Sequence, residues 1–103
     1  MFVLVSPGSQ SRARAAVHDP QDLGQLRVEF RDVGDEAAGA ALAAAGLGGA
    51  DGDHVWLEVS ALRAAGDGTT DWGARFDAML RYAQSQGWTN DQLTQVRAHI
   101  VRT

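Results

Sequence analysis

The sequence predicts an α+β fold, with a small sheet of two to three strands that is backed by an Ala-rich helix and a C-terminal helical hairpin. Segments 26–30 and 54–59 alternate apolar and polar residues, as strands with one buried face do. Segment 37–47 is rich in Ala and ends near Gly46. Two segments after residue 70 repeat apolar residues at helical spacing, which predicts the hairpin.

The N-terminal quarter is predicted to hold one short strand and a long loop. Residues 2–5, Phe-Val-Leu-Val, are typical of a strand covered on both faces or of a β-arm lying on a partner. Residues 6–23 show no sustained period and contain several Pro, Gly and Ser residues, so we expect a loop with room for one helical turn at 12–17. Because loops of this length are mobile or functional, this one is predicted to act as a lid.

The two alternating segments are predicted to be neighbouring strands. The Ala-rich segment between them is long enough for a crossover, which favours a parallel pair with the helix packed on one face. The predicted buried faces consist of Leu26, Val28 and Phe30 in the first strand and Val55, Leu57 and Val59 in the second.

Two helices are predicted directly after the second strand. Ser60 is expected to cap a short helix over 61–65. A longer helix starts at Thr70 or Asp71 and ends at Gly87. Its predicted apolar stripe consists of Trp72, Phe76, Met79, Leu80 and Ala83.

The last segment carries the signals of one more helix start. Thr89 and Gln92 have the spacing of a capping box, and Trp88 and Leu93 have that of a hydrophobic staple. The two C-terminal helices are therefore predicted to pack antiparallel. The buried stripe of the last helix is predicted to consist of Leu93, Val96 and Ile100, with Val101 as an optional further member.

The composition predicts one domain, residues 1–103, with a thin core. Of the 103 residues 46 are apolar, but 18 of these are Ala, and a further 12 residues are Gly. Since large apolar side chains are few, we expect a homodimer in which the partner covers residues 2–5 and Trp56. The chain has no apolar run long enough to span a membrane and no secretory signal, so we expect a cytoplasmic protein.

The charged residues narrow the classes of partner. Nine Arg, no Lys, ten Asp and three Glu give a net charge of −4, which argues against nucleic-acid and anionic-membrane partners. Every cation is a planar guanidinium suited to carboxylates, and none can form a Schiff base. The chain has no Cys, which excludes disulfides, thiolate metal sites and Cys nucleophiles.

The most informative set of residues is the predicted polar face of the sheet. A face with two Arg, two carboxylates, one His and one Trp could hold an amphipathic ligand or support proton transfer. It could equally be a solvated face on which Arg and Glu pair weakly and Trp56 covers apolar stems or a dimer partner. The face consists of Arg27, Glu29, Arg31, His54, Trp56 and Glu58.

Residue roles follow from the chemistry of these side chains. The sequence lacks phosphate-loop, serine-hydrolase and zincin motifs, and its three His have no metal-ligand spacing, so neither a cofactor nor a metal is expected. The candidate catalytic residues are His54 and Glu58, and the candidate ligand-binding residues are Arg27, Glu29, Trp56 and Arg75.

The C-terminal half resembles small accessory proteins of GC-rich bacteria. The residues that carry the resemblance are His54-Val55-Trp56-Leu57-x-Val59, then Trp72-x3-Phe76-x2-Met79-x2-Tyr82-Ala83-x3-Gly87-Trp88, and then Val96-Arg97-Ala98-His99. These proteins include the enzymes that close the lysinoalanine crosslink of cinnamycin-type lanthipeptides. The resemblance implies a cofactor-independent dimer that binds a modified peptide and promotes addition of an amine to a dehydroamino acid. It assigns no catalytic residue.

Two functions are therefore expected. The first is cofactor-independent binding or tailoring of a small molecule or peptide on the polar sheet face, with His54 or Glu58 as an acid/base group. The alternative is a non-catalytic homodimeric interaction or regulatory module, in which a second chain covers Trp56.

Overall fold

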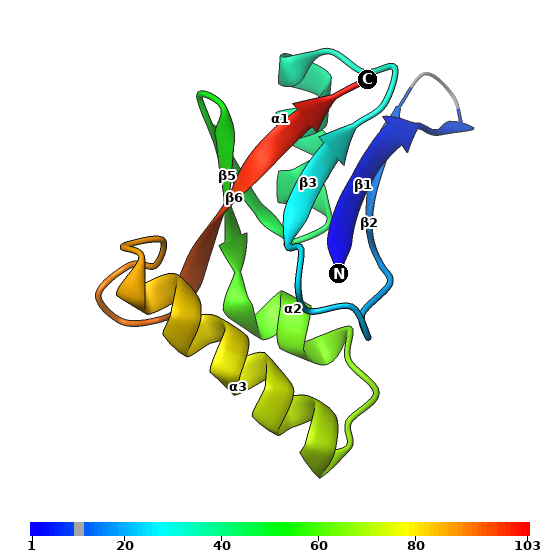
Figure 1. The fold of residues 1–103 in the computed structure, drawn as a ribbon. Coiled ribbons are helices and arrows are strands. Elements are labelled where there is room, and N and C mark those ends of the chain that lie inside the picture. Colours follow the sequence, from blue (N-terminus) through cyan, green and yellow to red (C-terminus); the bar gives the residue numbers. More distant parts are fainter. Residues whose placement is uncertain (10–11) are drawn as a thin grey trace.

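The computed structural model describes residues 1–9 and 12–103, which form six strands and three helices (Figure 1). The elements are β1 (Phe2–Pro7), β2 (Ala13–His18), β3 (Arg27–Phe30), α1 (Asp35–Ala44), β4 (Gly48–Asp51), β5 (His54–Glu58), α2 (Val59–Ala64), α3 (Thr70–Ser85) and β6 (Gln95–Arg102).

All six strands belong to one curled, mixed sheet with the order β2-β1-β3-β6-β5-β4. The pairs β1/β3 and β3/β6 are parallel, and the other three pairs are antiparallel. Helix α1 contacts β1, β2 and β4, so it lies on the concave inner face, behind the sheet in Figure 1. Helices α2 and α3 lie at the lower end of the sheet in that view. The α+β class is confirmed, but the prediction of two to three strands is wrong.

The predicted C-terminal helical hairpin is also wrong, because the last segment is the strand β6. Val96 and Ile100 are four residues apart, a spacing that both helical and strand periods satisfy. Ala98 lies between them on the same buried face, which only the strand period explains. The predicted capping box is a turn instead, in which Asn90 Oδ1 accepts hydrogen bonds from the backbone N–H groups of Thr94 (2.9 Å) and Gln95 (3.1 Å).

Strand β6 also overturns the predicted pairing of the two alternating segments. These segments are β3 and β5, and their apolar residues Val28, Phe30, Val55 and Leu57 are buried as expected. The two strands are not neighbours, because β6 lies between them, parallel to β3 and antiparallel to β5. A crossover of sufficient length permits a parallel pair but does not exclude an inserted third strand.

The predicted loop at 6–23 contains strand β2. Residues 10 and 11 of that loop lie outside the described residues, but 13–18 pair with β1 along its whole length. The inward residues Ala13, Ala15 and Val17 pack against the core, and two of them are Ala, so the strand has a weak hydrophobic pattern. The segment after β2 is tied to α3, because Trp72 Nε1 donates to the Pro20 carbonyl (2.7 Å). A paired strand and an anchored turn replace the predicted lid.

The core explains why residues 2–5 need no partner to be buried. Val3 and Val5 have exposed fractions of 0 % and pack on the inner face with Val28 and Phe30. Phe2 points to the other face, where its ring stacks on His18. The expectation that a second chain must cover the whole segment is therefore wrong for its inward residues, while a homodimer stays a prediction. Among the helices of the described ranges, none has the length and apolarity needed to cross a membrane.

Candidate functional site

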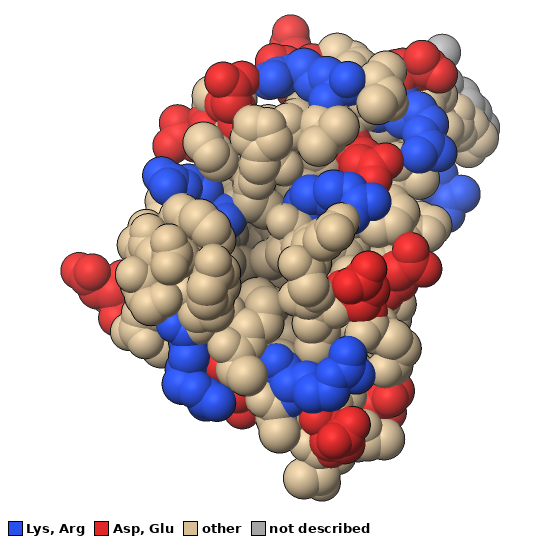
Figure 2. Space-filling view, in the orientation of Figure 1, with Lys and Arg blue, Asp and Glu red and all other residues tan. Residues whose placement is uncertain are grey.

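The outer face of the sheet carries one cross-strand row with a residue from every strand. The registered pairs are His18/Phe2, Phe2/Arg27, His99/His54 and His54/Asp51, and Arg27 precedes the pair Val28/Ile100, which places it beside His99. All three His of the chain thus lie in one row, although they are far apart in sequence. The outer face is turned toward the viewer in Figures 1 and 2, and Figure 2 shows Arg and acidic side chains interspersed with uncharged residues on it.

On one half of the outer face, Glu29 is held between two Arg side chains. Arg27 approaches Glu29 Oε2 to 2.7 Å, and Arg31 approaches Oε1 to 3.2 Å. The Arg27 guanidinium also lies 4.5 Å from the centroid of the Phe2 ring, which stacks on His18. Glu29 is only 9 % exposed, and its carboxylate forms ion pairs with both Arg27 and Arg31. This group stabilises the sheet, and both oxygens of Glu29 are occupied within it.

On the other half, His54 and His99 meet edge to face, with ring centroids 5.6 Å apart. Asp51 is the cross-strand neighbour of His54 on β4. In residues 1–9 and 12–103, however, no three His, Asp, Glu or Cys side chains converge in a way that could hold a metal ion. The pair therefore offers two imidazoles to a ligand on the face and no preformed metal centre.

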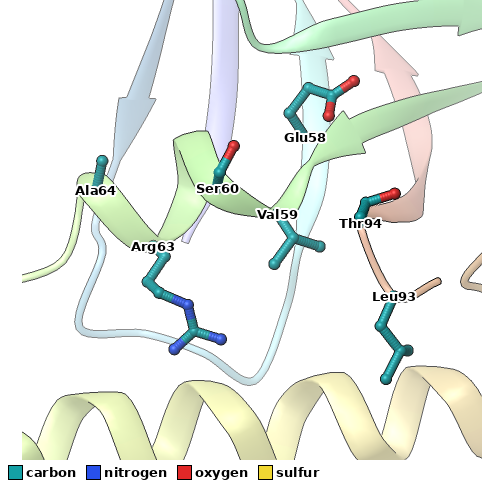
Figure 3. A pocket seen from close by; sticks show the side chains of 7 residues that line it. All are labelled: Glu58, Val59, Ser60, Arg63, Ala64, Leu93 and Thr94. Atoms are coloured by element: carbon teal, nitrogen blue, oxygen red, sulfur yellow. The ribbon is translucent and has the colours of Figure 1, made fainter.

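Glu58 lies in a separate, open hollow of about 590 Å³ at the base of β5. Figure 3 shows that Val59, Arg63 and Leu93 point toward α3, whereas Glu58 and Ser60 point to the opposite side. The Glu58 carboxylate accepts a hydrogen bond from Gln95 Nε2 (2.9 Å). The polar groups of this hollow do not converge on one point, which a catalytic site requires.

The two candidate catalytic residues are not brought together. His54 and Glu58 are four residues apart on one strand, which separates them by about 13 Å. General acid/base partners act on a reacting group within hydrogen-bond reach, so the two side chains cannot serve the same atom directly. Trp56 lies between them on the same face and is half-buried.

Arg75 lies on α3 and not on a strand of this face. Its guanidinium donates to the carbonyl of Gln21 (2.6 Å), beside the bond from Trp72 to Pro20. The nearby Asp67 carboxylate accepts hydrogen bonds from Thr69, which lower its pKa, and one from Gln21. Arg75 therefore anchors the segment between β2 and β3 on α3, and its role in ligand binding stays a prediction.

A pocket that the sequence analysis did not identify lies where α3 passes the outer face. It measures about 160 Å³ and is more enclosed than the hollow at Glu58. Figure 2 shows a hollow near the centre of this face, with Arg side chains on both sides. We call this 160 Å³ pocket the aromatic pocket. Its lining residues are Leu23, Gly24, Gln25, Leu26, Met79, Tyr82, Ala83, Trp88, Val96 and Arg97.

The turn after α3 builds the aromatic wall of this pocket. Gly87 has φ +78°, a backbone conformation that glycine adopts without a Cβ penalty, and Trp88 N–H donates to the Ala83 carbonyl (2.9 Å). This helix ending turns Trp88 back against Tyr82, with ring centroids 5.9 Å apart and planes at 74°. Tyr82 is 60 % exposed and Trp88 is 38 % exposed, so both rings are open to a ligand.

Two further contacts fix the other walls. Trp88 O accepts a hydrogen bond from the backbone N–H of Arg97 (2.7 Å), which holds the turn against β6, where Arg97 joins the lining. The wall formed by residues 23–26 follows the segment that Trp72 and Arg75 anchor on α3. The pocket is therefore preformed by backbone contacts between elements far apart in sequence.

Comparison with known proteins adds no assignment, since no family model, no curated protein and no solved structure matches this chain. The resemblance to lysinoalanine-forming enzymes thus stays a prediction, and the functional argument depends on the geometry of the outer face and the aromatic pocket.

Proposed function

We propose that this protein binds a small molecule or peptide by placing an apolar group of the ligand in the aromatic pocket. The main support is that Tyr82 and Trp88 line the same preformed pocket. They are two of the three exposed large apolar residues in the described part of the chain. Exposed aromatic rings in a concave site commonly mark ligand recognition.

The size of the pocket limits the group that enters it. Engineered apolar cavities of about 150 Å³ bind benzene, and the aromatic pocket measures about 160 Å³. The remainder of the ligand would lie on the outer face, next to Trp56 and His99, which flank Arg97 across and along the sheet. A single ring or a comparable aliphatic group therefore fits the pocket, and a polar group fits the rim.

A tailoring reaction would use a single acid/base group on this face. The candidates are His54 and Glu58, whose cross-strand partners His99 and Gln95 are each two residues from Arg97 on β6. We keep catalysis as an extension of the binding function, because binding needs only the aromatic pocket, whereas chemistry needs a substrate that reaches one of these two side chains.

Replacing Tyr82 by Ala is expected to weaken the binding of a neutral aromatic probe, 3-phenylpropionamide, by about tenfold or more. Tyr82 supplies one open wall, and losing a ring contact and its buried area costs about 1.5 kcal/mol or more. Because the side chain is mostly exposed, the fold should persist. The dissociation constant is measured by chemical-shift titration of the backbone amides.

Gln84→Ala is the matched control, since Gln84 is exposed on the same helix and does not line the pocket. It should leave the dissociation constant unchanged. Equal affinities for the wild type and Tyr82→Ala would overturn the proposed function, as would a wild type that binds neither this amide nor the corresponding acid, 3-phenylpropionate.

A further inference from the structure

We infer that the ligand of the aromatic pocket is a small aromatic carboxylic acid and that Arg97 binds its carboxylate. This inference rests on the proposed function and specifies that the ligand carries a negative charge. It depends on three features of the pocket: the charge of its lining, the partners of Arg97, and the number of hydrogen-bond donors at the rim.

The lining of the aromatic pocket has a positive charge, although the net charge of the protein is negative. Arg97 is the charged residue of the lining, and within residues 1–9 and 12–103 no Asp or Glu contributes to it. The whole chain, in contrast, has a net charge of −4. An anionic group at the rim would therefore meet a cation without a competing carboxylate, and an aromatic amine would be repelled.

Arg97 differs from the other Arg residues in being half-buried and without an ion pair or side-chain hydrogen bond to any described residue. The side chains of five others are occupied: Arg27 and Arg31 by Glu29, Arg63 by Asp77, Arg75 by the Gln21 carbonyl, and Arg102 by Asp35 and Asp53. Arg12, Arg14 and Arg81 are exposed on other parts of the surface.

The position of Arg97 favours a carboxylate. Its guanidinium presents two parallel N–H donors, which match the two oxygens of a carboxylate. Partial burial beside Trp56 and Trp88 reduces the screening that weakens exposed ion pairs. A phosphate dianion would call for further cations or a nest of backbone N–H groups, and the lining supplies one guanidinium. A monoanion is the better match.

The size of the aromatic pocket favours a small acid over a peptide. The pocket has room for one ring, and within the described residues Arg97 is the one cation of its lining, so we choose a probe in which a short linker joins ring and carboxylate. We take 3-phenylpropionate as the probe, because its amide has the same shape without the charge.

The test compares the acid and its amide on three proteins: the wild type, Arg97→Gln, and Arg81→Gln as the control. Arg81 is an exposed cation on α3 outside the lining. For the wild type, the acid should bind at least about tenfold more tightly than the amide, because an ion pair with the guanidinium replaces its hydrogen bond to a neutral carbonyl. Arg97→Gln should remove this preference by weakening the binding of the acid much more than that of the amide, whereas Arg81→Gln should preserve it.

The outcomes separate this inference from the proposed function. If acid and amide bind the wild type equally, or if Arg97→Gln retains the preference for the acid, the assignment of a carboxylate ligand is wrong while the pocket still binds an aromatic group. If an acetylated dipeptide with a C-terminal Phe carboxylate binds more tightly than 3-phenylpropionate, the ligand is a peptide and the assignment of a small acid is wrong. If neither acid nor amide binds, the proposed function fails as well.

Discussion

Gly48→Ala should lower the free energy of unfolding by about 3 kcal/mol. Gly48 begins β4 with φ +149°, where an L side chain is strained, and a Cβ built there would overlap the carbonyl oxygen of Trp56 on β5. The neighbour is backbone within a hydrogen-bonded pair, so it cannot move aside without breaking the register of β4 and β5. Urea denaturation followed by circular dichroism measures the loss.

The next residue along β4 provides the control for this substitution. Gly49 has no atom within 4 Å of the position of a new Cβ, so Gly49→Ala should change the stability by less than about 0.5 kcal/mol. Equal stabilities for the two variants would show that β4 does not approach β5 as the structure has it.

Trp72→Ala should lower the free energy of unfolding by about 3–5 kcal/mol. The side chain is 2 % exposed and stacks on Phe76 with ring centroids 5.0 Å apart. Its Nε1–H also donates to the Pro20 carbonyl, which joins α3 to the segment after β2. The variant therefore loses both a large buried surface and the anchor of one pocket wall.

Trp72→Phe separates the hydrogen bond from the packing. It keeps an aromatic ring on Phe76 but leaves the Pro20 carbonyl without its indole donor, so an intermediate loss of about 1–3 kcal/mol is expected. Arg81→Ala, on the exposed face of the same helix, should be nearly neutral. If Trp72→Ala were as stable as the wild type, α3 could not be packed through this residue.

Several elements were predictable because one physical signal dominated them. Val28 and Phe30 alternate with charged neighbours, which identified β3, and the stripe from Trp72 to Ala83 identified α3. Gly87 was expected to end α3, and its positive φ confirms the reason. In these segments the local sequence and the tertiary environment favour the same structure.

The strands β2 and β6 were not predicted, because the sequence pattern of β2 is weak and that of β6 also fits a helix. Strand β2 buries Ala13, Ala15 and Val17, and alternating Ala gives little hydrophobic contrast. Strand β6 alternates without interruption from Gln95 to Ile100, but the apparent cap at Thr89 favoured a helix. Without β2 and β6, the number of strands and their order could not be predicted.

The candidate site was predictable only in part. The alternation of β3 and β5 correctly placed Arg27, Glu29, His54, Trp56 and Glu58 on one face. It could not show that both oxygens of Glu29 form ion pairs with Arg27 and Arg31, because those pairs depend on side-chain geometry. The aromatic pocket joins α3, β6 and the segment before β3, so it depends on the strand order that was missed. The available signal was a Tyr lying off the apolar stripe of α3.

The most direct test of the account is a map of amide chemical shifts with and without 3-phenylpropionate. The account predicts that the largest changes fall on residues 23–26, on the segment from Tyr82 to Trp88, and on Val96 and Arg97, which together line the aromatic pocket. Largest changes at Glu58, Ser60 and Thr94, around the open hollow, would contradict it, as would a spectrum that does not change at millimolar ligand concentration.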